Sequence, residues 1–266
     1  MPDEPSLLID TTDQVLSLTL NRPERKNAIT VSMWETLREV LHEVTAGADV
    51  RAVVITGAGG SFCSGADISD ATGMDEFPDP VEQTRVINSV VQRLHDLPVP
   101  TIAKVRGVAA GAGWNLALGC DLVVATPEAR FCQIFARRAL SIDCGGSWLL
   151  PKLVGLQQAK RLALLAEMIG TDEAMALGLV TWVKSDDEID AFVGDLARGL
   201  AQGPSTALAQ TKSLLNGGAD RTMSTALAEE ARAAAVNLTG ADVIEAFAAW
   251  SEKRRPVFAG TRSPVR

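Results

Sequence analysis

Two glycine-rich segments of this chain could supply backbone N–H donors to a developing negative charge. One covers residues 57–67 (GAGGSFCSGAD) and the other residues 107–121 (GVAAGAGWNLALGCD), and each follows a short apolar run that predicts a buried strand. Small residues let the backbone approach a ligand closely, and the free N–H groups at a helix start stabilise negative charge. Two donor loops and one nearby carboxylate are the minimum equipment for chemistry through an enolate.

The candidate carboxylate is Asp143, which lies among apolar and small residues just before a predicted helix that begins at Ser147. Its local sequence favours a role as the N-cap of that helix. A catalytic role requires burial beside a polarised carbonyl and a pKa suited to accepting and returning a proton. Both interpretations stay open at this point. For Asp67, which follows a glycine turn, a structural role in fixing its loop is favoured.

Other kinds of site find little support in the sequence. Neither glycine-rich segment fits G-x-G-x-x-G, because Phe62 and Leu116 occupy the third position, and no phosphate-binding loop of the G-x-x-x-x-G-K-[ST] type occurs. The two histidines, His42 and His95, have no metal-like partner at the spacing of one helical turn. The four cysteines form no C-x-x-C pair, which predicts buried free thiols in a reducing compartment and no metal site.

The length and composition are typical of a globular protein that is long enough to bury a sizeable core. The chain has 266 residues, 47% of them apolar and 22% charged, with a net charge of −8. This acidic balance argues against nucleic-acid binding, and the only basic run, at 253–255, is too short to reverse it. No apolar stretch is long enough to span a membrane, and residues 1–5 (MPDEP) do not resemble a secretory signal. A cytoplasmic protein is therefore expected.

The pattern of apolar residues predicts β/α units over about the first 185 residues and helices over the rest. Strands are predicted at 7–10, 15–20, 52–56, 101–105, 122–125 and 129–132. Helices are predicted at 81–97, 147–154, 156–168, 171–177 and 189–200, and from 204 to about 250. A further helix with apolar residues from Met33 to Val44 is predicted to open with a capping box at Ser32 and Glu35.

Several of these motifs together resemble the crotonase (enoyl-CoA hydratase/isomerase) superfamily. The motifs are residues 21–28 (NRPERKNA), 62–67 (FCSGAD), 107–121 and the Gly145-Gly146 turn, in matching order and spacing, and the resemblance runs from about residue 7 to 258. It implies an α/β crotonase (ClpP-like) spiral of stacked ββα units with a C-terminal helical trimerisation region. We accordingly expect a spiral core with the CoA site over 1–200 and a helical oligomerisation region over 201–266, assembled as a homotrimer or a dimer of trimers.

The resemblance also implies an acyl-CoA thioester as substrate, so that coenzyme A arrives with the substrate and no separate cofactor is expected. The thioester carbonyl would lie between the backbone N–H groups of Ser64 and Ala112. The residues implied in CoA binding are Arg25, Ala28, Ala66, Asp67 and Ile68, with Lys253 and Phe258 completing the site from the same chain or from a neighbouring subunit.

Departures from the superfamily pattern favour one reaction. Hydratases of this group use two glutamates to hold and activate water, and this chain has Asn115 and Phe135 at those positions. Neither side chain exchanges a proton with water at neutral pH. Asp143 falls where the isomerase branch, which includes the epoxyphenylacetyl-CoA and 3,2-enoyl-CoA isomerases, keeps its single acid. The resemblance therefore implies an acyl-CoA isomerase in fatty-acid or phenylacetate metabolism.

In the expected reaction, Asp143 removes a proton from C2 of a 3-enoyl thioester and returns it at C4, or isomerises a ring-epoxide thioester. An acyl pocket of Trp114, Asn115 and Phe135 would keep water away from the enolate. The alternatives are an enoyl-CoA hydratase, a hydrolase or dehalogenase with an aspartate nucleophile, and a non-catalytic acyl-CoA binder. The dehalogenase would need tryptophan in place of Phe135 and a histidine close to Asp143.

Overall fold

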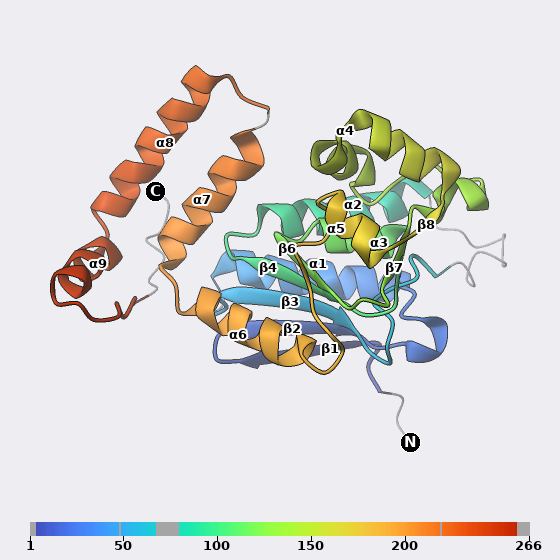
Figure 1. Ribbon diagram of the computed structural model, residues 1–266, viewed down its shortest axis with the longest axis horizontal. Helices are drawn as coiled ribbons and strands as arrows, with labels where there is room; N and C mark the ends of the chain where they lie inside the picture. The colour runs from blue at the N-terminus through green and yellow to red at the C-terminus, as the bar shows by residue number, and fades with distance from the viewer. Residues whose placement is uncertain (1–3, 48, 68–79, 219, 260–266) are drawn as a thin grey trace.

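The computed structural model describes residues 4–47, 49–67, 80–218 and 220–259. Within this part, a six-stranded sheet has the strand order β1-β2-β3-β4-β6-β9, and a smaller sheet has the order β5-β7-β8 (Figure 1). The larger sheet contains β1 (Leu7–Thr12), β2 (Val15–Leu20), β3 (Ala52–Gly57), β4 (Thr101–Val105), β6 (Leu122–Ala125) and β9 (Trp182–Val183). Only the β1–β2 hairpin is antiparallel in it.

Consecutive strands pass from one sheet to the other, and this gives the fold its spiral character. After β4, the chain turns at Gly107 and enters β5 (Val108–Ala110), and β6 is likewise followed by β7 (Arg130–Cys132). β8 (Met168–Gly170) completes the smaller sheet, antiparallel to β7. The segment after β3 likewise passes to the smaller sheet, because Cys63 forms an isolated parallel bridge with Ala109 of β5. The expected stack of ββα units is confirmed.

The helices follow these strand pairs and form the C-terminal region. They are α1 (Val31–Ala46), α2 (Pro80–Asp96), α3 (Ala112–Leu118), α4 (Gly146–Leu165), α5 (Thr171–Ala176), α6 (Ile189–Ala201), α7 (Ser205–Gly218), α8 (Met223–Leu238) and α9 (Ala241–Ser251), with 3₁₀ helices η1 (Pro23–Arg25) and η3 (Ile134–Arg138). The backbone of α4 is interrupted at Gly155, where φ is 74° and ψ is 159°. The separate helices predicted on either side of residue 155 are therefore present.

Apolar side chains cover both faces of the larger sheet. On one face α1 buries residues at helical spacing, among them Leu37 and Leu41, in a large core that also contains α2 and α3. On the other face, Ile189 and Val193 of α6 pack with Val54 in a smaller cluster. Central strands covered on both faces have few polar side chains, which is why they stand out in the sequence as apolar runs.

The local structure corrects two sequence predictions. Helix α1 begins at Val31, and its N-cap is Thr30, whose Oγ1 accepts a hydrogen bond from the Met33 N–H at 3.3 Å. The capping box at Ser32 and Glu35 is therefore wrong, because the helix has already started before Ser32. Helix α4 ends at Leu165, and Met168, predicted as the last residue of a helix, is the first residue of β8, where pairing with β7 satisfies its backbone. The four cysteines are buried and free, as predicted.

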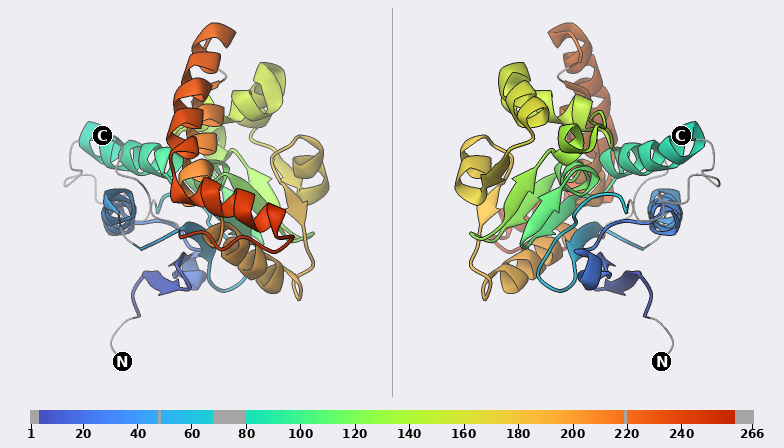
Figure 2. Two further views of the ribbon diagram at one scale, coloured as in Figure 1. Left: turned by 90° about the vertical axis from the view of Figure 1, so that its left-hand side faces the viewer. Right: turned by 90° about the vertical axis from the view of Figure 1, so that its right-hand side faces the viewer.

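The three C-terminal helices form an arm beside the core, with α8 and α9, in orange and red, farthest from the sheets (Figures 1 and 2). The base of the arm is fixed by polar contacts. Arg51 donates to Ser205 Oγ and to the Gly203 carbonyl oxygen, both at 2.9 Å, and Lys212 Nζ lies 2.8 Å from Asp121 Oδ2. Large apolar side chains remain exposed on the arm, namely Leu227, Leu238, Ile244, Phe247 and Trp250. In the described residues, no helix is long and apolar enough to cross a membrane.

Candidate active site

One cavity of about 270 Å³ brings together most of the residues that the sequence selects. Four segments of the chain form its walls: residues 25–28 at and after the end of η1, the loop after β3, the start of α3, and the stretch from η3 to the turn before α4. The lining residues are Arg25, Ala28, Ser64, Gly65, Ala66, Asp67, Gly111, Ala112, Ile134, Phe135, Arg138, Leu140 and Asp143. The sequence therefore selects a set of positions that converges in space.

The start of α3 approaches the loop after β3 with almost no side chain between them. Gly111, which precedes the helix, has φ 54° and ψ −128°, a conformation accessible essentially to glycine alone. A Cβ atom at Gly113 would lie 2.6 Å from the carbonyl oxygen and Sγ of Cys63. The Ala112 N–H is the first of the helix and has no acceptor within it. It therefore faces the cavity as a free donor.

The loop after β3 offers its free donor at a different residue from the one assigned by sequence. The Ser64 N–H donates to the Lys26 carbonyl oxygen at 2.9 Å, and Ser64 Oγ donates to the Arg25 carbonyl oxygen at 3.2 Å. Ser64 is therefore engaged in tying its loop to residues 21–28. This corrects the assignment of an oxyanion donor to Ser64, because its N–H already has a partner.

Two residues further on, the backbone is arranged differently. Ile29 donates to the Gly65 carbonyl oxygen and Asp67 donates to the Ile29 carbonyl oxygen, both at 2.9 Å. This parallel bridge leaves the Ala66 N–H pointing away from Ile29. It has no hydrogen-bond acceptor among the described residues, and Ala66 lines the cavity. Among the residues of the two glycine-rich segments that line the cavity, Ala66 and Ala112 are thus the ones whose backbone N–H groups have no acceptor in the described residues.

Asp143 contributes the carboxyl group of the cavity. Its Oδ1 atom is buried without a hydrogen-bond partner among the described residues, and burial raises the pKa of the carboxyl to about 6. Helix α4 has Gly145 as its N-cap, with no side chain capping it. The capping role that the local sequence favours for Asp143 is therefore wrong, because the helix begins three residues later with its own glycine cap.

Asp67 also lines the cavity, but its carboxylate is paired. Asp67 Oδ2 accepts a hydrogen bond from Arg22 Nη1 at 2.6 Å, and the same arginine donates to the Ala28 carbonyl oxygen at 2.8 Å. The pair fixes the loop after β3 against residues 22–28. The structural role favoured for Asp67 is confirmed, and its contact with CoA stays a prediction.

The three residues predicted for the acyl pocket separate in the structure. Phe135 lines the cavity, whereas Trp114 and Asn115 do not. Trp114 is buried against Phe131, with ring centroids 5.5 Å apart, and Asn115 is fully buried with both amide atoms hydrogen-bonded. They lie behind the wall because an α-helix turns successive residues to different sides.

Sequence reasoning missed several lining residues, including Arg138 and Leu140. A signal for Arg138 exists, because residues three apart in a 3₁₀ helix lie one above the other. Arg138 therefore shares the cavity side of η3 with Phe135. Leu140 follows the left-handed residue Ala139, and no sequence pattern indicates which way that turn directs it.

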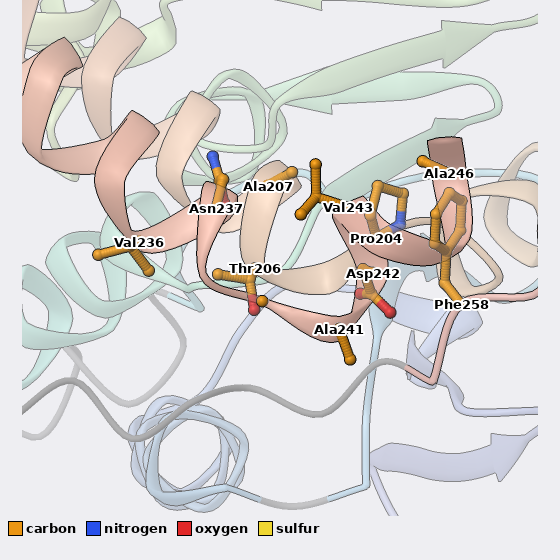
Figure 3. A pocket seen from close by; sticks show the side chains of 11 residues that line it. Pro204, Thr206, Ala207, Val236, Asn237, Ala241, Asp242, Val243, Ala246 and Phe258 are labelled. Atoms are coloured by element: carbon orange, nitrogen blue, oxygen red, sulfur yellow. The ribbon is translucent and has the colours of Figure 1, made fainter. Parts of the chain in front are cut away.

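Lys253 and Phe258 are not brought to this cavity within one chain. Phe258 lines a separate cavity of about 190 Å³ between α7, α8 and α9, where it lies near Ala246 and Pro204 (Figure 3). Lys253 lies in the turn after α9. Their contribution from a neighbouring subunit stays a prediction. Ile68 lies outside the described residues.

Other groups in the described residues do not enter the cavity. His95 packs edge-on against Trp148, with ring centroids 5.0 Å apart, and is absent from the lining of the Asp143 cavity. No group of three His, Cys, Asp or Glu side chains in this part of the chain could hold a metal ion. The cavity thus offers one unpaired carboxyl and two free backbone donors, and the arginines Arg25 and Arg138 also line it.

Comparison with known proteins decides the family. The family model described as enoyl-CoA hydratase/isomerase matches residues 10–261. The chain belongs to this family. Its members act on acyl-CoA thioesters and are usually oligomeric.

Named relatives in this family carry out different reactions. The chain is 38% identical to the 1,2-epoxyphenylacetyl-CoA isomerase of Escherichia coli K12, over 92% of this chain and 95% of that protein. It is 32% identical to the short-chain-enoyl-CoA hydratase of Clostridium acetobutylicum, over 94% of this chain and 96% of that protein. The crystal structure of an enoyl-CoA hydratase from Bacillus anthracis superimposes with a TM-score of 0.92 at 29% identity, covering 97% of this chain and all of that one. The relatives therefore establish family and fold, and the reaction must be argued from the cavity.

The raised pKa of Asp143 makes a prediction about stability. A carboxyl whose pKa rises from 3.8 to about 6 on folding binds its proton more tightly in the folded state. Its contribution to the free energy of unfolding is therefore fully present below pH 4 and is lost as the pH rises through 6. We expect Asp143→Asn to raise the melting temperature relative to wild type by a few degrees more at pH 7.5 than at pH 5. Thermal melts of both proteins at both pH values measure this, and an equal difference at the two pH values would contradict it.

Proposed function

We propose that this protein is an acyl-CoA isomerase that shifts the double bond of a 3-enoyl-CoA thioester, or isomerises a ring-epoxide thioester, through an enolate. The observation that carries the proposal is the cavity that holds the unpaired carboxyl of Asp143 with the free N–H groups of Ala66 and Ala112. Proton removal next to a thioester carbonyl needs these groups and no others. Coenzyme A arrives as part of the substrate.

The proposed reaction transfers one proton from C2 to C4. The Asp143 carboxylate takes the C2 proton, and the electrons of that C–H bond move towards the carbonyl, giving a dienolate with negative charge on the thioester oxygen. The N–H groups of Ala66 and Ala112 stabilise that charge, and losing one such donor typically costs about 10²–10³ in rate. Asp143 then returns the proton at C4, which leaves a 2-enoyl thioester. Atoms and charge balance without a co-reactant.

The electrostatics of Asp143 suit both halves of this reaction. With a pKa of about 6, the carboxyl is mostly ionised at neutral pH and is a stronger base than an ordinary aspartate. It remains weak enough as a base to release the proton again. Burial is the cause of the shift, and the apolar side chains of Ile134 and Phe135 in the same cavity supply the low-dielectric surroundings.

Hydration of a 2-enoyl thioester is the second candidate, because relatives of this chain include a hydratase. Two carboxylates that hold water are expected for that reaction. In this cavity Asp143 is one carboxyl, and Asp67, the other, is paired with Arg22. The position of the first hydratase acid is occupied by Asn115, whose amide nitrogen and oxygen are hydrogen-bonded to the Asp143 carbonyl oxygen and to Gln133, and which does not line the cavity. These contacts favour isomerisation.

The remaining alternatives lack a needed group. An aspartate nucleophile for dehalogenation would need a histidine beside it, and His95 packs on Trp148 outside the cavity. A protein that only binds acyl-CoA would have no use for a buried carboxyl that is costly to ionise. The variant Asp143→Asn distinguishes that binder from an enzyme.

A paired assay tests the reaction. We expect the purified protein to convert a 3-enoyl-CoA to the 2-enoyl isomer without change of mass and to leave crotonyl-CoA unhydrated. Asp143→Asn should lower kcat at least about 10³-fold, in the range of a lost acid–base group, with the affinity for a saturated acyl-CoA nearly unchanged. Mass spectrometry of the products and calorimetric titration of the ligand measure the two effects. Addition of water to crotonyl-CoA, or full activity of Asp143→Asn, would overturn the proposal.

The oxyanion donor at Ala112 can be removed without breaking its helix. Proline is well tolerated at the first position of a helix, where its missing N–H has no intrahelical acceptor. Ala112→Pro should therefore lower kcat about 10²–10³-fold with little change in the circular dichroism spectrum. Ala112→Gly keeps the donor and is the control, with kcat expected close to wild type. Equal activity of the two variants would exclude this N–H from the reaction.

The same proposal includes assembly as a homotrimer or a dimer of trimers through the C-terminal arm. Trp250 of α9 is 81% exposed and Phe247 is 64% exposed in the single chain, which is unusual for aromatic side chains without a partner. Native mass spectrometry should give three or six times the chain mass of 28.1 kDa. Trp250→Glu should release smaller species, whereas Glu230→Gln on α8 should not. A monomer in the wild-type sample would contradict this part.

A further inference from the structure

The structure assigns a positioning role to Asn115: we propose that its amide braces the turn that bears Asp143 against helix α3 and so sets the distance between acid and oxyanion donor. The inference rests on the proposed function, because it concerns the reach of Asp143 towards a thioester held at Ala112. Asn115 itself does not line the cavity. Its amide is buried inside the protein, where it makes hydrogen bonds to two other segments of the chain.

Both ends of the amide are occupied. Asn115 Nδ2 donates to the Asp143 carbonyl oxygen at 2.8 Å, and Asn115 Oδ1 accepts a hydrogen bond from Gln133 Nε2 at 2.7 Å. Asn115 and Gln133 are each 0% exposed. A buried amide with two directional partners has one orientation, because rotating it by 180° would set donor against donor and acceptor against acceptor. The brace is therefore rigid.

The turn that Asn115 holds has little intrinsic stability. Cys144 and Gly145 are successive residues in the left-handed region, with φ of 52° and 74°. Such a conformation at a non-glycine residue costs on the order of 1 kcal/mol and persists only where surrounding contacts impose it. The Asp143 carbonyl oxygen accepts hydrogen bonds from both Asn115 and the Gly146 N–H, the latter at 3.0 Å. These two bonds hold the turn together with a third, which Cys144 Sγ donates to the Ala112 carbonyl oxygen at 3.6 Å.

Gly146 shows how closely the amide and the turn approach each other. A Cβ atom at this position would lie 2.3 Å from Asn115 Nδ2 and 2.8 Å from its Oδ1. The amide therefore packs directly on the bare Cα of Gly146, and no other residue fits there without displacing it. The glycine of the sequence motif and the buried asparagine are two parts of one contact.

The brace matters because no hydrogen bond in the described residues orients the carboxyl of Asp143 itself. Its Oδ1 has no hydrogen-bond partner there, so its position follows from its own backbone. Asn115 lies three residues after Ala112 in α3, about 4.5 Å along the helix axis. The donor for the thioester oxygen and the anchor of the acid thus belong to one short helix. A displacement of about 1 Å between reacting groups can cost about 10² in rate.

The experiment compares shape-preserving variants with a control of similar burial. Asn115→Leu keeps the branching of the side chain and removes both hydrogen bonds, and Gln133→Met releases only the far end of the amide. Thr171→Val is the control, because buried Thr171 donates to Thr126 and Ala129 carbonyl oxygens away from the cavity. All three should lower the melting temperature. We expect kcat to fall at least about tenfold in Asn115→Leu and less in Gln133→Met, with KM within about twofold, and no change of kcat in Thr171→Val.

A second measurement does not depend on turnover. The Asp143 carboxyl can be titrated by ¹³C NMR in protein labelled at its aspartate carboxyls, with Asp143→Asn used to assign the signal. Wild type should titrate near 6, and Asn115→Leu or the milder Gln133→Met should titrate closer to the ordinary 3.8, because a displaced carboxyl is better solvated. Failure of wild type to isomerise would overturn the proposed function alone. An unchanged titration together with unchanged kcat in the Asn115 and Gln133 variants would overturn the brace.

Discussion

The site depends on one close contact between two backbones, the start of α3 and the loop after β3. Gly113 has no side chain, and a Cβ atom there would overlap Cys63 at 2.6 Å. This approach brings the free N–H groups of Ala112 and Ala66 to the same cavity, one just after β5 and the other in the loop that follows β3. Neither loop alone forms a site. The spiral of paired strands brings them together because each ββα unit stacks on the one before it.

A second constraint is the cost of keeping an ionisable carboxyl in an apolar cavity. Burial raises the pKa of Asp143, so part of the folding free energy is lost when this group ionises at neutral pH. The same surroundings make the carboxylate a stronger base. The loss of stability and the gain in basicity therefore have one cause. The neighbouring turn is also strained, because Cys144 and Gly145 are both in the left-handed region, and contacts to α3 hold it in place. Such local conflicts with stability are typical of functional sites.

Much of this arrangement could be predicted from the sequence. Strands buried on both faces appear as apolar runs, and glycine-rich segments after them mark the loops, so the β/α units follow from the pattern of residues. The assignment of a donor to Ala112 and of the acid to Asp143 comes from the resemblance to the crotonase superfamily, because the local sequence of Asp143 favours a helix cap. The predictions that failed depend on hydrogen-bond pairing. Nothing in residues 62–67 says that Lys26 uses the N–H of Ser64 and leaves that of Ala66 free. Likewise, the choice of Thr30 over Ser32 as N-cap depends on where α1 begins. The partners of Asn115 are 18 and 28 residues away along the chain and leave no local pattern.

The central claim is that a single carboxyl carries the proton from one carbon of the substrate to another. The most direct test uses a 3-enoyl-CoA deuterated at C2, converted in ordinary water under single-turnover conditions, with the product analysed by NMR. If Asp143 alone takes and returns the proton in a cavity that excludes water, a measurable fraction of the deuterium must appear at C4 of the 2-enoyl product. A product with no deuterium at C4, or one that has gained water, would contradict the account.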